Sequence, residues 1–175
     1  HSLKVANDSG GYTVNSINPF RNEGQKTIIY RALEHLDWHP PDWIVYPGGA
    51  LGNTSSCGKA LMELVNWGWI KKVPRLLVIN AIGANTFYEL TNGLYDGRKL
   101  EWNDGKPDIA LIRDYYHERD QKGIKAKTKA TAIQIGKPAN IVKALRAIEF
   151  TKGMVIEVSD EETVSYTHLR AHETR

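Results

Sequence analysis

A glycine-rich loop between an apolar run and a helical pattern is the feature that most constrains the fold of this chain. Trp43 to Tyr46 is an apolar run typical of a buried strand. The loop reads PGGALGNTSS over residues 47–56, and apolar residues then recur at helical spacing from about Ser56 to Trp67. Glycines let backbone N–H groups turn toward an anion, and a helix start adds free donors and partial positive charge. The loop is therefore either an anion site or a tight strand-to-helix turn capped by serine.

Two common nucleotide-binding patterns do not fit this loop. A Walker loop places four residues between Gly and Gly-Lys-Ser/Thr. Here five residues separate Gly52 from Gly58 and Lys59, and Ala60 replaces the hydroxyl residue. The spacing of Gly49, Gly52 and Gly58 also differs from Gly-x-Gly-x-x-Gly, and no acidic residue ends a second strand about 20 residues further on. We exclude both patterns.

Strand and helix patterns alternate along the rest of the chain. Strands are predicted at 43–46, 75–80 and 154–158, helices at 23–37, 56–67, 84–91, 108–121 and 141–148, a β-prone run at 12–16 and a surface excursion at 92–106. This alternation predicts an α/β fold, with an open, mainly parallel sheet flanked by helices and joined by right-handed crossovers. Ligands of such sheets bind at the carboxyl ends of the strands. The loop after Tyr46 and the segment from Asn15 to Arg21 are therefore the candidate sites.

Composition removes several other classes of function. The 175 residues correspond to one domain, and the 23 basic and 20 acidic residues are interspersed, which is not the charge pattern of a nucleic-acid-binding surface. No stretch approaches the ~20 apolar residues that a membrane helix needs. A lone cysteine, Cys57, can form neither an internal disulfide nor a cysteine metal site, which favours a reducing, cytoplasmic location. We expect no nucleic-acid partner, no membrane partner and no metal.

Several stretches agree, in order, with one enzyme family. They are NSINPFRNEGQKT at 15–27, PGGALGNTSSCGK at 47–59, PRLLVINAIGAN at 74–85, ATAIQIGKPAN at 130–140, KALR at 143–146 and VSDEE at 158–162. Over roughly residues 11–162 the chain resembles the threonine synthases, which use pyridoxal phosphate. The resemblance implies a type II pyridoxal-phosphate fold, like that of the tryptophan synthase β chain. It also implies conversion of O-phospho-L-homoserine and water to L-threonine and phosphate.

The same resemblance implies roles for particular residues. The backbone of five loop residues would bind the cofactor phosphate: Gly49, Ala50, Leu51, Gly52 and Asn53.

A second group of residues would bind the substrate. Asn15, Ser16 and Arg21 would hold the substrate phosphate, because a guanidinium fork suits a phosphoryl dianion. The residues alone favour a different interpretation of Arg21, as a surface charge at a helix entry. Residues 130–132 would pass near the cofactor ring, or else simply form a buried strand.

The chain also departs from the family pattern. Ala50 stands where Asn is usual, and Lys137 and Ala139 stand where Asn and Val are more typical. The Schiff-base lysine of the family lies in a Lys-Asp-Arg segment that is not among these 175 residues, and the residue that meets the pyridine nitrogen belongs beyond Glu162. We therefore assign no catalytic residue and expect no catalysis by this chain alone. Residues 1–163 are interpreted as part of an enzyme domain, and 164–175 as a foreign tail that resembles translated adaptor DNA.

Other functions stay open at this stage. A cysteate synthase would also take a phosphorylated substrate, whereas a threonine dehydratase would need no phosphate clamp. A non-catalytic protein that binds phosphate esters is a further alternative. Under the main interpretation, the partner is the small molecule O-phospho-L-homoserine, and the full-length protein is a cytoplasmic monomer or homodimer.

Overall fold

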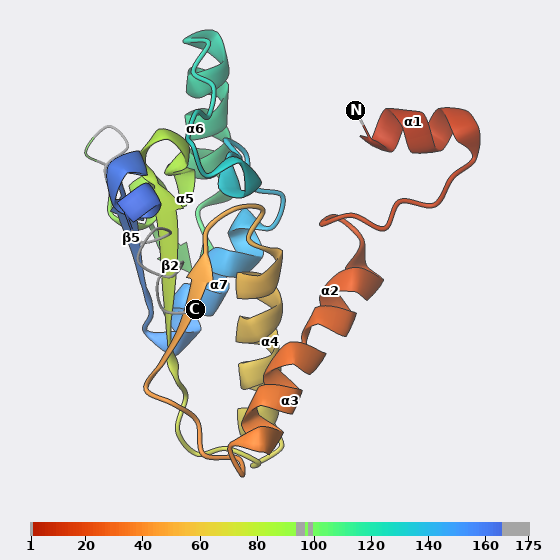
Figure 1. The fold of residues 1–175 in the computed structure, drawn as a ribbon, viewed down its shortest axis with the longest axis vertical. Coiled ribbons are helices and arrows are strands. Elements are labelled where there is room, and N and C mark those ends of the chain that lie inside the picture. Colours follow the sequence, from red (N-terminus) through yellow and green to blue (C-terminus); the bar gives the residue numbers. More distant parts are fainter. Residues whose placement is uncertain (1, 94–96, 98–99, 166–175) are drawn as a thin grey trace.

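The computed structural model describes residues 2–93, 97 and 100–165 (Figure 1). Its elements, in chain order, are α1 (Ser2–Ser9), α2 (Pro19–Gln25), α3 (Thr27–His35), β1 (Trp43–Pro47), α4 (Gly52–Asn66), β2 (Arg75–Ala81), the 3-10 turn η1 (Ile82–Ala84), α5 (Thr86–Thr91), β3 (Trp102–Asn103), β4 (Lys106–Pro107), α6 (Ile109–Gln121), the 3-10 turn η2 (Thr131–Ile133), α7 (Ile141–Thr151) and β5 (Met154–Val158). Residues 160–165 are also helical. Most of the predicted tail, 164–175, lies outside the described residues.

Three parallel strands form the central sheet in the order β1-β2-β5. Tyr46 pairs with Val78, and Val78 pairs with Val155, so the strands run in register across the sheet. Helix α4 connects β1 to β2, and α5 to α7 lie between β2 and β5 (Figure 1). The predicted α/β fold with a parallel, helix-flanked sheet is confirmed. Because all three strands run the same way, their carboxyl ends share one edge.

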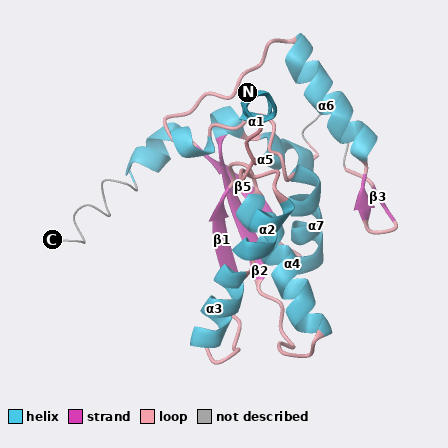
Figure 2. Cartoon of the chain, turned by 90° about the vertical axis from the view of Figure 1, so that its right-hand side faces the viewer, coloured by secondary structure: helices cyan, strands magenta, loops and turns pink. Residues whose placement is uncertain are grey.

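Helices cover one face of this sheet. Leu76 and Val78 of β2 are fully buried in two core clusters that also contain Leu61 of α4 and Leu145 of α7. Both helices stand beside the strands in Figure 2, and they pack against each other at Gly58, where an added Cβ would lie 2.2 Å from the Cβ of Ala147.

The opposite face of the sheet keeps apolar side chains exposed. Trp43, Val45 and Met154 are 38%, 53% and 43% exposed, and the pairing register puts all three on the same face. The prediction that 43–46 is a buried strand is therefore right about the strand and wrong about burial. An apolar run alone cannot distinguish a strand covered on both faces from one covered on a single face.

Neither of two further strand-like stretches pairs as a strand. Residues 12–16 form no strand: Asn15 begins a turn closed by the N–H of Asn18, and the Asn18 amide donates to the carbonyl of Thr13. The apolar stretch at 130–135 contains η2, in which Thr131 and Ala132 are exposed. In both places hydrogen bonds within the segment replace the pairing that a strand would need.

Two helix starts differ from the predicted ones. The helix predicted at 23–37 is two helices that meet at Lys26, and the first starts at Pro19, where the Asn18 side chain accepts a hydrogen bond from the N–H of Arg21. The helix predicted from Ser56 begins at Gly52. Apolar periodicity marked only the buried turns of these helices, and their polar first turns carry no such pattern.

Candidate functional site

The glycine-rich loop lies at the carboxyl end of β1 and turns directly into α4. Leu51 has a left-handed backbone (φ 61°) and a side chain that is only 3% exposed in the core. The first helical hydrogen bond runs from the N–H of Ser55 to the carbonyl of Leu51. Among the described residues, no acceptor meets the backbone N–H groups of residues 49–54. The loop therefore presents a row of free donors at a helix N-terminus, as an anion requires.

A buried asparagine on β2 holds the start of this loop. The amide of Asn80, 1% exposed, donates to the carbonyl of Gly48 at 2.7 Å, and its oxygen accepts from the N–H of Tyr88 at 2.9 Å. A Cβ at position 48 would lie 2.4 Å from the Asn80 nitrogen, so this close approach requires glycine. Asn80 thus ties the loop to β2 and α5.

A second buried asparagine, at the start of α7, holds the middle of the loop. The backbone N–H of Asn140 donates to the carbonyl of Ala50 at 3.3 Å. Its side-chain amide donates to the carbonyl of Ser16 at 2.9 Å, and its side-chain oxygen accepts from the amide of Asn22 at 3.2 Å. Asn140 therefore joins the loop to the segment that contains Ser16, although these parts lie far apart in the sequence.

The turn η2 closes over Gly49. A Cβ at that position would lie 3.3 Å from a methyl group of Ile133 and 3.5 Å from the carbonyl oxygen of Ala132. The end of the segment 130–132 therefore lies beside the loop, in a 3-10 turn and not in a strand. Its place near the cofactor ring stays a prediction.

Unpaired side-chain groups are also present at this site. Within the part of the chain that the structure describes, the buried hydroxyl of Thr54 has no hydrogen-bond partner. The same holds for the side-chain oxygen of Gln25, which lies 3.3 Å from the position of a Cβ on Gly52. A buried hydroxyl without a partner is unfavourable in isolation, and a bound group can satisfy it. The row of free N–H groups and the Thr54 hydroxyl together fit a phosphate group.

The three residues assigned to the substrate phosphate lie at or just before α2. Ser16 adjoins the loop through Asn140, as described above. The Asn15 side chain accepts from the N–H of Ile17 at 3.0 Å. Arg21 is exposed, and it lines an open depression together with Asn15 and residues of α1. No acidic partner of Arg21 lies among the described residues, so its guanidinium is available to an anion. Sequence reasoning missed Asn80 and Asn140, since only the fold brings these two asparagines to the loop.

The other reactive side chains near the loop are unsuited to catalysis. Burial raises the pKa of the Cys57 thiol to about 12, despite a hydrogen bond with Tyr46, so the thiol stays protonated at neutral pH. Lys26 lies 2.7 Å from Glu23 and 2.7 Å from Glu63. Burial favours its neutral form, but the hydrogen bonds to these two carboxylates outweigh burial and raise its pKa. Cys57 is thus a core residue, and Lys26 is a structural cation.

In the described ranges no helix is long and apolar enough to cross a bilayer. Within those ranges, no group of three or more His, Cys, Asp or Glu side chains could hold a metal ion.

Comparison with known proteins connects this geometry with a family. Residues 1–175 match the family described as pyridoxal-phosphate dependent enzymes. The chain belongs to that family. It is 33% identical over 159 residues to threonine synthase 2, chloroplastic, of Arabidopsis thaliana, and 36% identical over 160 residues to the threonine synthase of Methanocaldococcus jannaschii. These alignments cover 90% and 91% of the chain but only 27% and 34% of the relatives. This pyridoxal-phosphate dependent family member thus spans about a quarter to a third of the length of those relatives.

A solved structure supports the same fold. The crystal structure of a threonine deaminase from T.th. superposes with a TM-score of 0.55 over 96% of this chain and 50% of that chain, at 16% sequence identity. At this identity the likeness concerns the fold, which is therefore the type II fold of the pyridoxal-phosphate dependent family.

Proposed function

We propose that this chain forms the phosphate-binding part of a threonine synthase, which converts O-phospho-L-homoserine and water to L-threonine and phosphate. The observation that carries the proposal is the row of free N–H groups at residues 49–54, at the end of β1. The threonine synthases among its relatives, which match about nine-tenths of the chain, support this choice within the family.

The residues of the loop fit the cofactor that the family name specifies. The backbone N–H groups of Gly49, Ala50, Leu51, Gly52 and Asn53 would hold the cofactor phosphate, and the Thr54 hydroxyl would add a donor. When bound, pyridoxal phosphate would supply an electron sink for bonds breaking in the substrate. The contribution of this chain is to hold and orient it. The loop uses backbone donors, so Ala50 at a position where Asn is usual leaves the phosphate contacts intact.

The substrate phosphate would lie next to the cofactor phosphate. Arg21 would bind it through the guanidinium fork, with Asn15 and Ser16 giving neutral hydrogen bonds beside the charge. The link through Asn140 between Ser16 and Ala50 supports this arrangement, because it fixes the substrate segment against the cofactor loop. No residue of this chain is proposed as the lysine that binds the cofactor covalently.

Binding measurements on the chain test the substrate assignment. Pyridoxamine phosphate fills the cofactor site without forming an imine with a lysine amine, and the saturated chain is then titrated with O-phospho-L-homoserine, L-homoserine and L-threonine. We expect the phosphorylated substrate to bind at least tenfold more tightly than L-homoserine, because it alone offers a dianion to Arg21.

A matched pair of variants locates the contact. Arg21→Ala should weaken O-phospho-L-homoserine at least tenfold, while Arg113→Ala, which removes an exposed arginine of α6, should leave it unchanged. Equal loss in both variants would mean general charge attraction and not a site. Preferential binding of L-threonine would favour the dehydratase alternative.

Two further proposals concern the setting of the enzyme. We propose a cytoplasmic location, which the single buried cysteine supports, and a monomer or homodimer as the assembled form. Compartment fractionation and sedimentation of the protein would test them.

A further inference from the structure

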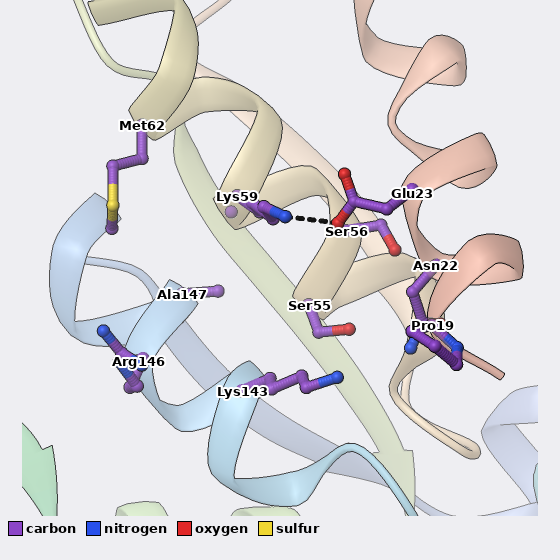
Figure 3. Close-up of a pocket in the computed structure, with 11 residues that line it drawn as sticks. Pro19, Asn22, Glu23, Ser55, Ser56, Lys59, Met62, Lys143, Arg146 and Ala147 are labelled. Atoms are coloured by element: carbon purple, nitrogen blue, oxygen red, sulfur yellow. Dashed lines mark hydrogen bonds and ion pairs between the residues drawn. The ribbon is translucent and has the colours of Figure 1, made fainter. Parts of the chain in front are cut away.

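A cavity of about 320 Å³ lies between α2, α4 and α7, and none of residues 49–53 lines it (Figure 3). It is therefore separate from the candidate cofactor loop. Three basic residues line it, Lys59 from α4 and Lys143 and Arg146 from α7. The sequence analysis singled out none of them as binding residues.

The charges around this cavity do not cancel. Lys59 is paired with Glu23, the acidic residue of the lining. Lys143 and Arg146 are exposed, and neither has an acidic partner within the part of the chain that the structure describes. The lining thus carries two uncompensated positive charges, which attract a dianion.

A buried hydroxyl at the same cavity is also without a partner. Ser56 is 2% exposed, and its hydroxyl makes no hydrogen bond within the described residues. By contrast, the neighbouring Ser55 hydroxyl donates to the carbonyl of Gly52 at 2.8 Å. Figure 3 shows Lys143 extending from α7 toward Ser55. One unsatisfied donor and two unpaired cations therefore line the same cavity, and such groups favour an anion.

We propose that this cavity binds a phosphate group, as inorganic phosphate or as a small phosphate monoester. The two free cations match the charge of a phosphate dianion, and a carboxylate would balance only one of them. Ser56 supplies a neutral donor, and one of the several oxygens of the dianion can accept its hydrogen bond. Inorganic phosphate leaves part of a 320 Å³ cavity unfilled, so there is room for the organic part of an ester.

Titration of the ¹⁵N-labelled chain tests the proposal. Inorganic phosphate is added at constant ionic strength, with glycerol 3-phosphate in a parallel series and chloride as the control salt. We expect saturable shifts of the backbone amides of Ser56, Lys143 and Arg146, and the tighter of the two ligands identifies the source of the phosphate. Shifts confined to residues 49–53 would place phosphate only in the cofactor loop and would overturn the second site. Because the two sets of amides are read separately, the test does not depend on the proposed function.

Charge-matched variants remove the remaining ambiguity. The double variant Lys143→Ala, Arg146→Ala should weaken phosphate binding at least tenfold. The control Arg113→Ala, Lys125→Ala removes the same charge from other exposed positions and should leave binding unchanged. Equal affinities in the two double variants would overturn the proposal.

The buried serine gives a readout that a structural role would not. Ser56→Ala should leave the stability of the phosphate-free chain unchanged or higher, because it removes an unsatisfied buried hydroxyl, and should weaken phosphate at least threefold. Unchanged phosphate affinity would contradict the donor assignment.

Discussion

Replacing Asn140 by alanine should destabilise the chain by about 2–4 kcal/mol. Its side chain, 4% exposed, makes a 2.9 Å bond to the carbonyl of Ser16 and accepts a 3.2 Å bond from Asn22. Each bond contributes about 0.5–1.5 kcal/mol net, and the Asn22 amide, left buried without an acceptor, adds about 1 kcal/mol. The longer approach to the carbonyl of Ala50, 3.5 Å, is too weak to add to this sum.

Helix capping does not contribute to the stability that Asn140 provides. Asn140 occupies the N-cap position of α7, yet its side chain makes no capping hydrogen bond. Asn140→Ser should therefore fail to restore stability, because serine is a good cap but is too short to bridge Ser16 and Asn22.

Denaturant unfolding followed by the fluorescence of the five tryptophans measures these differences. A loss below about 0.5 kcal/mol for Asn140→Ala would refute the reasoning, because it would lie under the contribution of a single net hydrogen bond. Full rescue by serine would refute it differently, by showing that capping is what counts.

Three other predictions concern packing, the exposed sheet face and pH. Gly58→Ala should lower the free energy of unfolding by about 1–3 kcal/mol, because the new Cβ would lie 2.2 Å from the Cβ of Ala147. Gly24→Ala, where an added Cβ would have no atom within 4 Å, should leave that free energy unchanged or raise it. Equal effects of the two substitutions would contradict the close contact between α4 and α7 at Gly58. Val45→Lys should reduce concentration-dependent association in sedimentation experiments, because it places a charge on the exposed apolar face, and unchanged association would mean that this face is not involved. The carboxylate of Asp160 accepts hydrogen bonds from a hydroxyl and from a backbone N–H group in the loop before η2, and both lower its pKa. The stability that Asp160 contributes is therefore complete above its unfolded pKa of about 3.9 and is lost as the pH falls further. Asp160→Asn should therefore reduce the stability difference between about pH 6 and about pH 3, and an unchanged difference would show that this tie is unimportant.

Local sequence patterns predicted the helices and strands well where buried apolar residues recur at regular spacing along the chain. The strands at 75–80 and 154–158 and the helix after Asn140 follow directly from apolar spacing. Local patterns failed where the deciding partner is distant. The exposure of Val45 depends on what covers the sheet, and the apolar stretch at 130–135 folds as η2 against Gly49 instead of pairing as a strand.

The candidate site likewise combines residues that the local sequence identifies with residues that only the fold brings together. The glycines of the loop predict an anion site, because the backbone freedom of glycine can be inferred from the sequence alone. Asn80 and Asn140, which hold the loop in place, are ordinary polar residues until the fold brings them to Gly48 and Ala50. The roles of Arg21 and of the loop residues toward their ligands stay predictions.

The most direct test of the central claim compares two ligands that differ only in the phosphate, pyridoxamine phosphate and pyridoxamine, bound to this chain. We predict that pyridoxamine phosphate binds at least tenfold more tightly, in keeping with charge-assisted hydrogen bonds from several N–H groups, and shifts the amide signals of Gly49 to Asn53. Equal affinities, or shifts that leave those amides unchanged, would contradict the assignment of this loop as the site of the cofactor phosphate.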